Sequence, residues 1–370
     1  MRLFWIVFLP AAAYQLLAVF AAVRHLAKRY LDRSHPANFN PGVSVLKPLR
    51  GIDPNTYSAF VSQIKQNYRD FEILFGANDE NDAAAAEVRR LQQQFPGGPV
   101  RLIIGGESTA NGKVGVLINL ARHARNSVWV VNDSDIKVTP DYLSRIVAPL
   151  ADPSIGVVTC PYRAQAHTLP AAWESLGIAT DFMPSALVAP LVGVREFGLG
   201  STLAFRAADL EQAGGLASIA DYLADDYQLA KRITSLGKRA LLSTYTVETS
   251  LGEATWSGVW QHQLRWARTI RLSKGGGYLG LPITYAGLWA GAAIVFGAWP
   301  VAVLLLALRC LSALMTGGFV LQSRLAATFC WLAPVWDLYG VCIWIASYSG
   351  RTVRWRDRIL RIGPDGRIQK

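Results

Sequence analysis

The sequence predicts an α/β protein with an open, twisted, mostly parallel sheet flanked by helices, and with transmembrane helices at both ends. Strand-like and helix-like patterns alternate between residues 41 and about 275, which is typical of parallel strands joined by right-handed crossovers. Hydrophobic residues make up 51% of the chain and charged residues only 17%, which is apolar for a soluble protein. Long apolar segments lie at residues 3–23, 285–308 and 325–346.

Apolar and β-branched segments predict the strands, and segments with helical spacing predict the helices. The segment SVWVVN at 127–132 is nearly all apolar, which suits a central parallel strand covered on both faces. The expected strands lie at residues 43–49, 71–78, 100–105, 127–132, 155–160, 200–206 and 240–249. One expected helix begins at Pro54, and the others lie at residues 83–95, 113–125, 224–236 and 255–274.

The first apolar segment, residues 3–23, is long enough for one crossing of a hydrocarbon core ~30 Å thick. A cleaved signal peptide is the alternative, but the apolar run is too long and no Ala-x-Ala site precedes a soluble start. Basic residues follow the segment at Arg24, Lys28, Arg29 and Arg33. The positive-inside rule therefore places the following chain in the cytoplasm, with the bacterial inner membrane as the expected location. The basic tail from Arg351 is expected on the same side, which favours three crossings, with four as the alternative.

These patterns divide the chain into five parts. The order is a transmembrane anchor with a basic juxtamembrane segment, a cytosolic α/β domain, an amphipathic interfacial helix, further transmembrane helices and a basic cytosolic tail. The corresponding residues are 1–40, 41–254, 255–280, 281–350 and 351–370.

The net charge indicates which class of partner to expect, and the cysteine spacing shows whether a metal site is expected. The net charge is +11, and Lys and Arg crowd beside the apolar segments, which favours an anionic lipid surface. Nucleic acid is not expected, since no nucleic-acid fold signature appears. The four cysteines lack metal-ligand spacing and are interpreted as buried thiols.

Two carboxylates, Asp133 and Asp135, follow the apolar strand at 127–132. Carboxylates two residues apart around a turn can share one hard cation, and Mg²⁺ or Mn²⁺ binds through one or two carboxylates plus substrate phosphates. Asn132 and the residues after it would also suit a plain turn. Ligands bind beyond the carboxyl ends of strands in open α/β sheets, so the position favours a cation site.

Asp79 also ends a predicted strand, where a nucleotide base or ribose could be held. The alternative is a helix cap, because Asp82 or Asn81 could begin the helix at 83. Lys113 opens a helix after a glycine, where backbone N–H groups and a lysine together can steady a diphosphate. A solvated lysine in the first turn is the alternative.

Two further groups of residues have both a structural and a chemical interpretation. Asp225 and Asp226 lie near a helix start, where they either meet the helix dipole or supply a general base that takes a proton from an acceptor hydroxyl. His262 and Arg265 lie one helical turn apart, with Trp266 beside them. They either neutralise a leaving phosphate beside a sugar site floored by Trp266, or anchor the helix at the interface.

Five motifs occur in an order that resembles one family. They are PGVSVLKPLRGIDPN at 41–55, the strand end with Asp79, NDSDIKV, LADDYQLAK and the helix with HQLRW. Together they resemble the ceramide glucosyltransferases of glycosyltransferase family 21, with bacterial hopanoid-associated glycosyltransferases a close second. The resemblance covers residues 41 to about 275 and the flanking spans. It implies a GT-A fold for the domain at 41–254, a UDP-sugar donor and a divalent cation, Mg²⁺ or Mn²⁺.

The resemblance also implies residue roles. Asp79 would belong to the uridine site, Asp133 with Asp135 to the metal diphosphate, and Asp226 to the base. The terminal signature usually reads Gln or Arg, two residues, then Arg-Trp; Arg265 and Trp266 match it, whereas His262 departs from it. Donor contacts are assigned to Pro48, Asp79, Lys113, Asp133, Asp225 and His262. The metal is assigned to Asp133 and Asp135, and catalysis to Asp226, Arg265 and Trp266.

The activity that the resemblance implies is inverting transfer of glucose from UDP-glucose to the primary hydroxyl of ceramide, a membrane lipid. Transfer from UDP-N-acetylglucosamine, or another UDP-sugar, to a hopanoid polyol is the alternative within the same chemistry. A non-catalytic nucleotide-binding membrane regulator is disfavoured because the acidic residues are intact. A processive polysaccharide synthase is disfavoured because few spans remain to build a channel.

Overall fold

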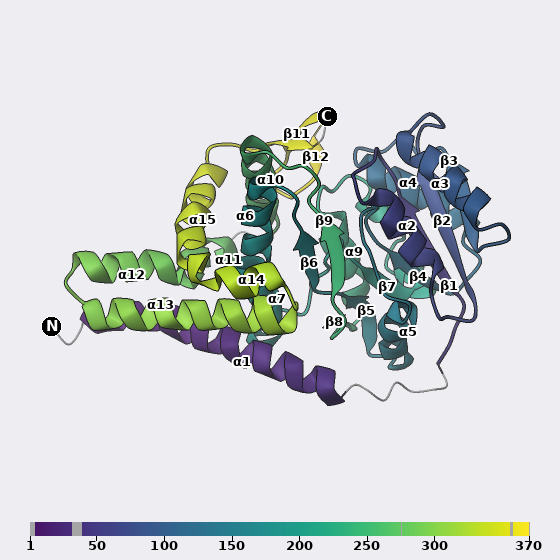
Figure 1. The fold of residues 1–370 in the computed structure, drawn as a ribbon. Coiled ribbons are helices and arrows are strands. Elements are labelled where there is room, and N and C mark those ends of the chain that lie inside the picture. Colours follow the sequence, from purple (N-terminus) through teal and green to yellow (C-terminus); the bar gives the residue numbers. More distant parts are fainter. Residues whose placement is uncertain (1–3, 32–38, 275, 356–357, 370) are drawn as a thin grey trace. The chain divides into compact units, whose positions relative to one another are not determined.

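The computed structural model describes residues 4–31, 39–274, 276–355 and 358–369. The chain divides into two compact units (Figure 1), each considered by itself below. The helical unit comprises Met1–Leu31, Arg163–Gly193 and Glu253–Lys370, and the sheet unit comprises Asp32–Tyr162 and Val194–Gly252. Arg33, expected in the basic juxtamembrane segment, lies outside the described residues, as do residues 356, 357 and 370 of the tail.

A mixed sheet of seven strands forms the centre of the sheet unit, counted over its described residues (Figure 1). The strand order is β3-β2-β1-β4-β7-β5-β8, and only β7 runs antiparallel to its two neighbours. The strands are β1 (Val43–Pro48), β2 (Phe71–Ala77), β3 (Val100–Ile104), β4 (Val128–Val131), β5 (Ile155–Thr159), β7 (Leu203–Arg206) and β8 (Arg239–Leu242). This is the open, mostly parallel sheet that the sequence predicts.

Helices flank this sheet on its apolar faces. Every residue of β1 and β4 is buried, as expected for central strands covered on both sides. Helix α4 packs so closely on β2 that a Cβ at Gly76 would lie 2.5 Å from Val116 Cγ1. The helices and short helical turns are α2 (Thr56–Ile64), α3 (Ala83–Gln94), α4 (Gly112–His123), α5 (Tyr142–Val147), η2 (Ala148–Ala151), α8 (Ala207–Gln212), η5 (Leu216–Ile219) and α9 (Asp225–Thr234).

The parallel strands bring their carboxyl ends to one edge of the sheet. Pro48 pairs with Gly76 near the ends of β1 and β2, and Leu46 pairs with Val131 at the end of β4. Asp79 therefore leaves the sheet at the same edge as Asp133, two residues after the end of its own strand. This edge is where ligands bind in open α/β sheets.

One predicted strand differs from the structure. The segment at 240–249 is two strands, β8 and β9 (Val247–Ser250), with an intervening bend. The bend carries β9 to the segment after Asp135, because Lys137 and Glu248 exchange backbone hydrogen bonds of 2.8 and 3.1 Å. One continuous strand over 240–249 would not bring Glu248 to Lys137.

The helical unit contains four helices that are long and apolar enough to cross a membrane, counted over the described residues. Two lie largely in predicted apolar segments: Ile6–Leu31 and Arg324–Ser347. The segment expected as one span at 285–308 is divided, because the short helix Ala286–Val295 ends before the third long helix, Trp299–Val320, begins. The fourth, Leu169–Val192, was not expected; it falls in the segment assigned to the soluble domain at 41–254 but clusters with the helical unit. Glu174 and Asp181 interrupt its apolar pattern, which is why the sequence did not reveal it.

Several long helices of the helical unit are irregular. Two π-helical turns, η3 and η7, interrupt the helices. The elements are η1 (Phe4–Phe8), α1 (Leu9–Leu31), α6 (Leu169–Gly177), η3 (Ile178–Phe182), α7 (Met183–Val188), η4 (Ala189–Val192), α10 (Trp256–Lys274), α11 (Gly276–Leu279), η6 (Leu281–Thr284), α12 (Ala286–Val295), α13 (Trp299–Ala313), η7 (Leu314–Val320), α14 (Arg324–Phe329), η8 (Cys330–Leu332) and α15 (Ala333–Ser347). In the sequence, β6 (Tyr162–Gln165) precedes α6.

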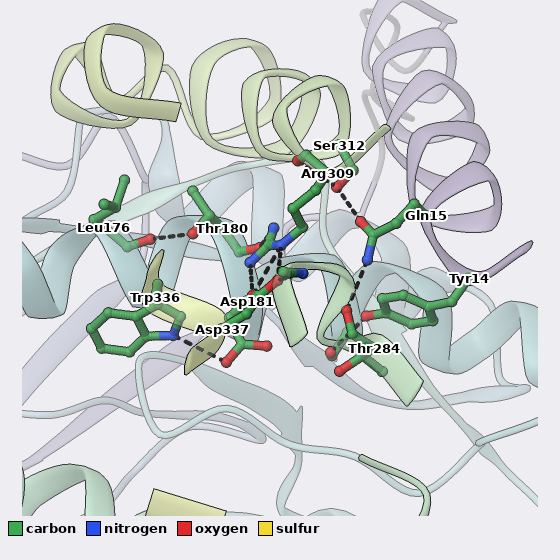
Figure 2. A network of polar contacts seen from close by, with 12 residues as sticks. Tyr14, Gln15, Leu176, Thr180, Asp181, Thr284, Arg309, Ser312, Trp336 and Asp337 are labelled. Atoms are coloured by element: carbon green, nitrogen blue, oxygen red, sulfur yellow. Dashed lines mark hydrogen bonds and ion pairs between the residues drawn. The ribbon is translucent and has the colours of Figure 1, made fainter. Parts of the chain in front are cut away.

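A buried polar network lies between these apolar helices (Figure 2). Arg309 of α13 binds both oxygens of Asp337 on α15, with its shortest contact from Nη2 at 2.7 Å. Its Nη1 donates to the Thr180 carbonyl at 2.6 Å, and Gln15 of α1 joins the network through Ser312. Polar groups buried in an apolar bundle cost free energy unless they are hydrogen-bonded. The hydrogen bonds of this network meet that need, and they link several helices of the unit.

The structure adds detail to the tail and corrects one expectation about the cysteines. The basic tail forms a small antiparallel sheet of β10 (Thr352–Trp355), β11 (Arg358–Ile362) and β12 (Ile368–Gln369). Cys160 is buried as expected, but Cys342 is exposed, because it lies on the outward apolar face of α15. The buried-thiol interpretation is therefore wrong for Cys342.

Candidate active site

A cluster of acidic side chains and one lysine lies at the strand ends of the sheet unit. Lys113 Nζ contacts Asp133 Oδ1 at 2.8 Å and Asp225 Oδ2 at 3.0 Å. Asp133 follows β4, Lys113 lies in the first turn of α4, and Asp225 begins α9. The structure thus brings together three residues that the sequence predicted separately. Lys113 is not the solvated lysine of the alternative interpretation, since its side chain is only 19% exposed.

Asn111 explains why α4 and α9 start beside one another. Its side-chain oxygen caps α4 by accepting from Lys113 N at 3.0 Å. Its side-chain nitrogen donates to the Tyr222 carbonyl at 2.8 Å, and its own N–H donates to the Ala220 carbonyl at 2.9 Å. A fully buried asparagine therefore joins the helix that carries Lys113 to the loop that precedes Asp225.

Charge attraction keeps the Lys113 side chain protonated. Burial alone would lower its pKa, but the nearby carboxylates of Asp133 and Asp225 outweigh burial and raise the pKa above the ordinary value. Lys113 is therefore a permanent cation held between two anions.

Gly200 lies between Asp133 and the second acid of α9, Asp226. A Cβ at Gly200 would stand 3.1 Å from Asp133 Oδ2 and 3.4 Å from Asp226 Oδ2. The two carboxylate oxygens therefore lie no farther apart than the sum of these distances. The predicted metal-binding and base residues share one small space in the sheet unit.

Asp226 has the electrostatics of a tuned carboxylate. Burial and the neighbouring Asp225 raise its pKa to about 6, against the opposing attraction of Lys113. The Tyr227 N–H donates to Asp226 Oδ1 at 2.7 Å. Asp226 Oδ2 is the oxygen that faces Gly200 and Asp133. Asp226 lies in the first turn of α9, so the helix-dipole interpretation also holds for its position.

Lys47 is a charged residue of this site that the sequence analysis missed. It is fully buried in β1, and its Nζ donates to Asn132 Oδ1 at 2.8 Å and to the Asp133 carbonyl at 2.7 Å. Burial lowers its pKa to about 7, although Asp135 and Asp133 act in the opposite direction. The available signal was a lysine within the apolar strand VSVLKPL.

Asp135 is anchored by β9. Thr249 Oγ1 donates to Asp135 Oδ2, and the Ser250 N–H donates to the same oxygen at 3.2 Å. Burial and the charge of Asp133 raise the pKa of Asp135. These contacts orient Asp135 through one oxygen and place its carboxylate in the field of Asp133.

Asp79 and Pro48 lie at the same sheet edge without joining the charged cluster. Asp79 is exposed and accepts from the Asn81 N–H at 2.9 Å. Asp82, by contrast, is the cap of α3, accepting from Ala84 N at 2.8 Å. Asp79 is therefore not needed as a cap, and Pro48 is a buried end residue of β1.

The donor set fits a hard divalent cation. Four carboxylates (Asp133, Asp135, Asp225 and Asp226) lie around Lys113, which stays charged, and Lys47, whose pKa burial lowers to about 7. Burial among like charges raises the pKa of both Asp135 and Asp226. Added positive charge would relieve this excess. Over the described residues, no group of three or more His, Cys, Asp or Glu side chains is arranged to hold a metal. Asp133 and Asp135 would supply oxygen ligands, the type that Mg²⁺ and Mn²⁺ prefer, and water and substrate phosphates would complete the coordination shell.

The remaining predicted residues lie in the helical unit, on α10. His262 Nδ1 contacts Glu174 Oε1 at 2.6 Å, and the His262 and Trp266 ring centroids are 4.7 Å apart. Trp266 also packs on Phe182, with ring centroids 5.3 Å apart. His262 and Trp266 therefore form one packed group with α6 and η3, and Arg265 lies between them in sequence.

Gly200 gives a test of the site's geometry. Replacing it with Ala is expected to lower the kcat/KM of the reaction at this site about tenfold, because the new methyl group enters the space between the two carboxylates and Asp133 must shift by a few tenths of an ångström. The melting temperature should stay near that of the wild type. Gly291→Ala is the control, since a Cβ there meets nothing within 4 Å. Wild-type kcat/KM in Gly200→Ala would show that this space is not used.

Comparisons with known proteins identify the family. The sequence model of glycosyl transferase family 21 matches residues 3–368. Ceramide glucosyltransferase 1 of Caenorhabditis elegans is 29% identical over 231 residues, which is 62% of this chain and 49% of that protein. Ceramide glucosyltransferase 3 of the same organism is 26% identical over 232 residues, 62% of this chain and 50% of that protein. The chain spans about half the length of these relatives.

Solved structures resemble the chain more distantly. A mannosyltransferase of Pyrobaculum calidifontis, in complex with GDP-mannose and Mn²⁺, covers 90% of this chain and 99% of its own at 21% identity and a TM-score of 0.49. GalNAc-T7 with UDP, GalNAc and Mn²⁺ covers 69% of this chain and 52% of its own at 15% identity and a TM-score of 0.45.

The family match extends over nearly the whole chain, and the motifs that carry the resemblance lie inside it. The α/β GT-A fold class predicted from the sequence is confirmed, with a mostly parallel sheet flanked by helices and apolar helices toward both ends. The chain belongs to glycosyl transferase family 21.

Proposed function

We propose that this protein is a membrane glycosyltransferase that moves glucose from UDP-glucose to the primary hydroxyl of ceramide. The observation that carries the proposal is the meeting of Asp133 and Asp226 across Gly200, with Lys113 beside them. An acid that can share a cation with a diphosphate and an acid that can take a proton are the two groups that such a transfer needs within one space. The curated relatives named ceramide glucosyltransferases support the choice of acceptor.

The donor side uses Asp133 and Asp135. They would hold Mg²⁺ or Mn²⁺ against the diphosphate of the UDP-sugar, and the cation would supply positive charge for the leaving oxygen. Lys113 orients Asp133 through its 2.8 Å contact, and Asp225 fixes the other side of the lysine at 3.0 Å. Lys47 holds the turn that carries Asp133, because its Nζ donates to the Asp133 carbonyl. We assign Pro48 and Asp79, at the neighbouring strand ends, to the uridine part of the donor.

The acceptor side uses Asp226 as the general base. Its Oδ2 takes the proton of the lipid hydroxyl while the hydroxyl oxygen forms a bond to the anomeric carbon of the sugar. The bond between that carbon and the diphosphate oxygen breaks, so UDP leaves and the configuration inverts. A pKa of about 6 leaves Asp226 ionised at neutral pH while keeping it more basic than an ordinary aspartate.

The family signature on α10 completes the proposal. Arg265 and His262 would neutralise charge on the departing diphosphate, and Trp266 would floor the sugar or lipid site. The lipid acceptor reaches the protein from the bilayer, which agrees with the apolar helices of the helical unit. We place the sheet unit on the cytoplasmic side, with the basic residues near the spans on an anionic lipid surface.

Lipid analysis tests the proposal. A host that makes ceramide and expresses the protein should accumulate a hexosylceramide visible by mass spectrometry, and Asp133→Ala should abolish it. Purified protein with UDP-glucose and UDP-N-acetylglucosamine, each offered ceramide or a hopanoid polyol, identifies the substrate pair. Product from UDP-N-acetylglucosamine and the hopanoid alone would overturn the ceramide assignment. Nucleotide binding without any transfer would overturn the enzyme assignment.

A further inference from the structure

Glu174 is a buried acid that the proposed chemistry does not use. It lies on α6, is 2% exposed, and has two nitrogen atoms within hydrogen-bond distance of the same oxygen, Oε1. His262 Nδ1 is 2.6 Å from that oxygen and Gln263 Nε2 is 2.8 Å from it. A carboxylate buried this completely is costly unless it is paired or hydrogen-bonded. Both partners are neighbours on α10, so Glu174 is directed at the HQLRW helix.

The chemistry of these groups determines the proton on His262. An ionised carboxylate can only accept hydrogen bonds, so Nδ1 must carry the hydrogen. The other ring nitrogen, Nε2, then bears a lone pair in the neutral ring and a hydrogen in the charged ring. Over the described residues no hydrogen bond or ion pair of Nε2 is seen, and the side chain is 28% exposed. Nε2 is therefore the nitrogen that His262 can offer to a ligand.

Packing fixes the ring as well as its proton. Trp266 lies one turn along α10, with its ring centroid 4.7 Å from that of His262. Phe182 of η3 supports Trp266 from the other side at 5.3 Å. The imidazole is held by a hydrogen bond at Nδ1 and by an aromatic ring, so both its orientation and its tautomer are set before a ligand arrives.

We propose that Glu174 is a positioning residue: it holds His262 through Nδ1 so that Nε2 is presented in a fixed direction to a phosphate oxygen of a ligand. This inference rests on the proposed function for the identity of the ligand, but not for the state of the ring. An imidazole held by a carboxylate at Nδ1 presents Nε2 from a fixed direction.

Glu174→Gln tests the state of the ring. The amide has the same size and can still accept, but it can also donate, so Nδ1 is no longer obliged to carry the hydrogen. The measurement is NMR of ¹⁵N-histidine-labelled protein in nanodiscs without substrate, with the His262 signal assigned by its loss in His262→Gln. We expect the Nδ1–H tautomer in the wild type and its loss in Glu174→Gln. Glu253→Gln, which removes an exposed acid of the same unit, should leave the signal unchanged.

A double-mutant cycle separates positioning from simple helix packing. Glu174→Gln should lower kcat about tenfold in the wild type but cause little further loss in a His262→Gln background, because Glu174 acts through the histidine. A packing role would give the same loss in both backgrounds and would overturn the inference. An Nε2–H tautomer in the wild type would also overturn it. If the wild type transfers no sugar, the proposed function fails while the NMR result still decides the role of Glu174.

Discussion

Replacing Asp226 with Asn is expected to lower kcat for sugar transfer about 10²- to 10⁴-fold, the usual contribution of a general base. Asparagine keeps the size of the side chain and can still accept from the Tyr227 N–H, which lies 2.7 Å from Oδ1. It cannot take the proton of the acceptor hydroxyl. The measurement is the initial rate of sugar transfer to the lipid acceptor at saturating donor, together with UDP affinity, which should be retained.

Asp221→Asn is the matched control, because Asp221 is an exposed aspartate of the same unit. The pH profile gives an independent check. Burial and Asp225 raise the pKa of Asp226 to about 6, so the base is protonated below that pH and the wild-type rate should fall there. A wild-type rate in Asp226→Asn, with its pH profile unchanged, would contradict the base assignment.

Asp337→Asn is expected to destabilise the protein by about 3–5 kcal/mol, the cost of breaking a buried ion pair. The side chains of Arg309 and Asp337 are 3% and 0% exposed, and Arg309 binds the carboxylate at 2.7–3.0 Å. Without the carboxylate the guanidinium stays charged among apolar helices, because an arginine does not lose its proton in a protein. Figure 2 shows the contacts that Arg309 makes in the wild type. Thermal unfolding in nanodiscs, followed by circular dichroism, measures the loss.

An exposed ion pair and a double substitution are the controls for this result. Asp365→Asn removes an acid that lies 3.5 Å from Arg367 with both side chains more than half exposed, so its effect should be about 0–1 kcal/mol. Replacing both partners, as Arg309→Met with Asp337→Leu, should recover much of the stability, because no unpaired charge remains. Equal melting temperatures for Asp337→Asn and Asp365→Asn would mean that the buried pair does not stabilise the fold.

The sheet and its acidic edge could be predicted because they follow from local pattern and from a general rule of parallel sheets. The run at 127–132 is apolar enough to be a central strand, and β4 is buried throughout. Once β1, β2 and β4 are parallel, the residues after them must share an edge. Asp79 and Asp133 were therefore placed at the same edge from sequence alone, and Lys113 at the start of the helix that reaches it.

Other parts of the site depend on contacts between distant residues and could not be read from the chain. Lys47 is a lysine in an apolar strand, and only the 2.8 Å contact to Asn132 shows what its charge does. Glu174 and His262 are 88 residues apart, and no periodicity links them. Asp226 and Asp133 share a space at Gly200, where a Cβ would contact both carboxylates, and they are 93 positions apart in the chain.

The apolar spans show the same limit. The expected spans were found by their long apolar runs, but Leu169–Val192 contains Glu174 and Asp181 and was assigned to the soluble domain. In the structure Glu174 is paired with His262, and Asp181 accepts from Trp336 Nε1 at 3.2 Å. Acids that find partners inside a helical bundle weaken the apolar pattern of a helix without preventing its burial.

Calorimetric titration of UDP tests the central claim most directly, because that claim concerns binding by the acidic edge of the sheet unit. Nanodisc-embedded wild type should bind UDP in the presence of Mn²⁺ and lose saturable binding when a chelator is added. Asp133→Ala should not bind UDP with Mn²⁺, whereas Asp226→Asn should bind it as the wild type does. UDP binding that survives both the chelator and Asp133→Ala would contradict the account.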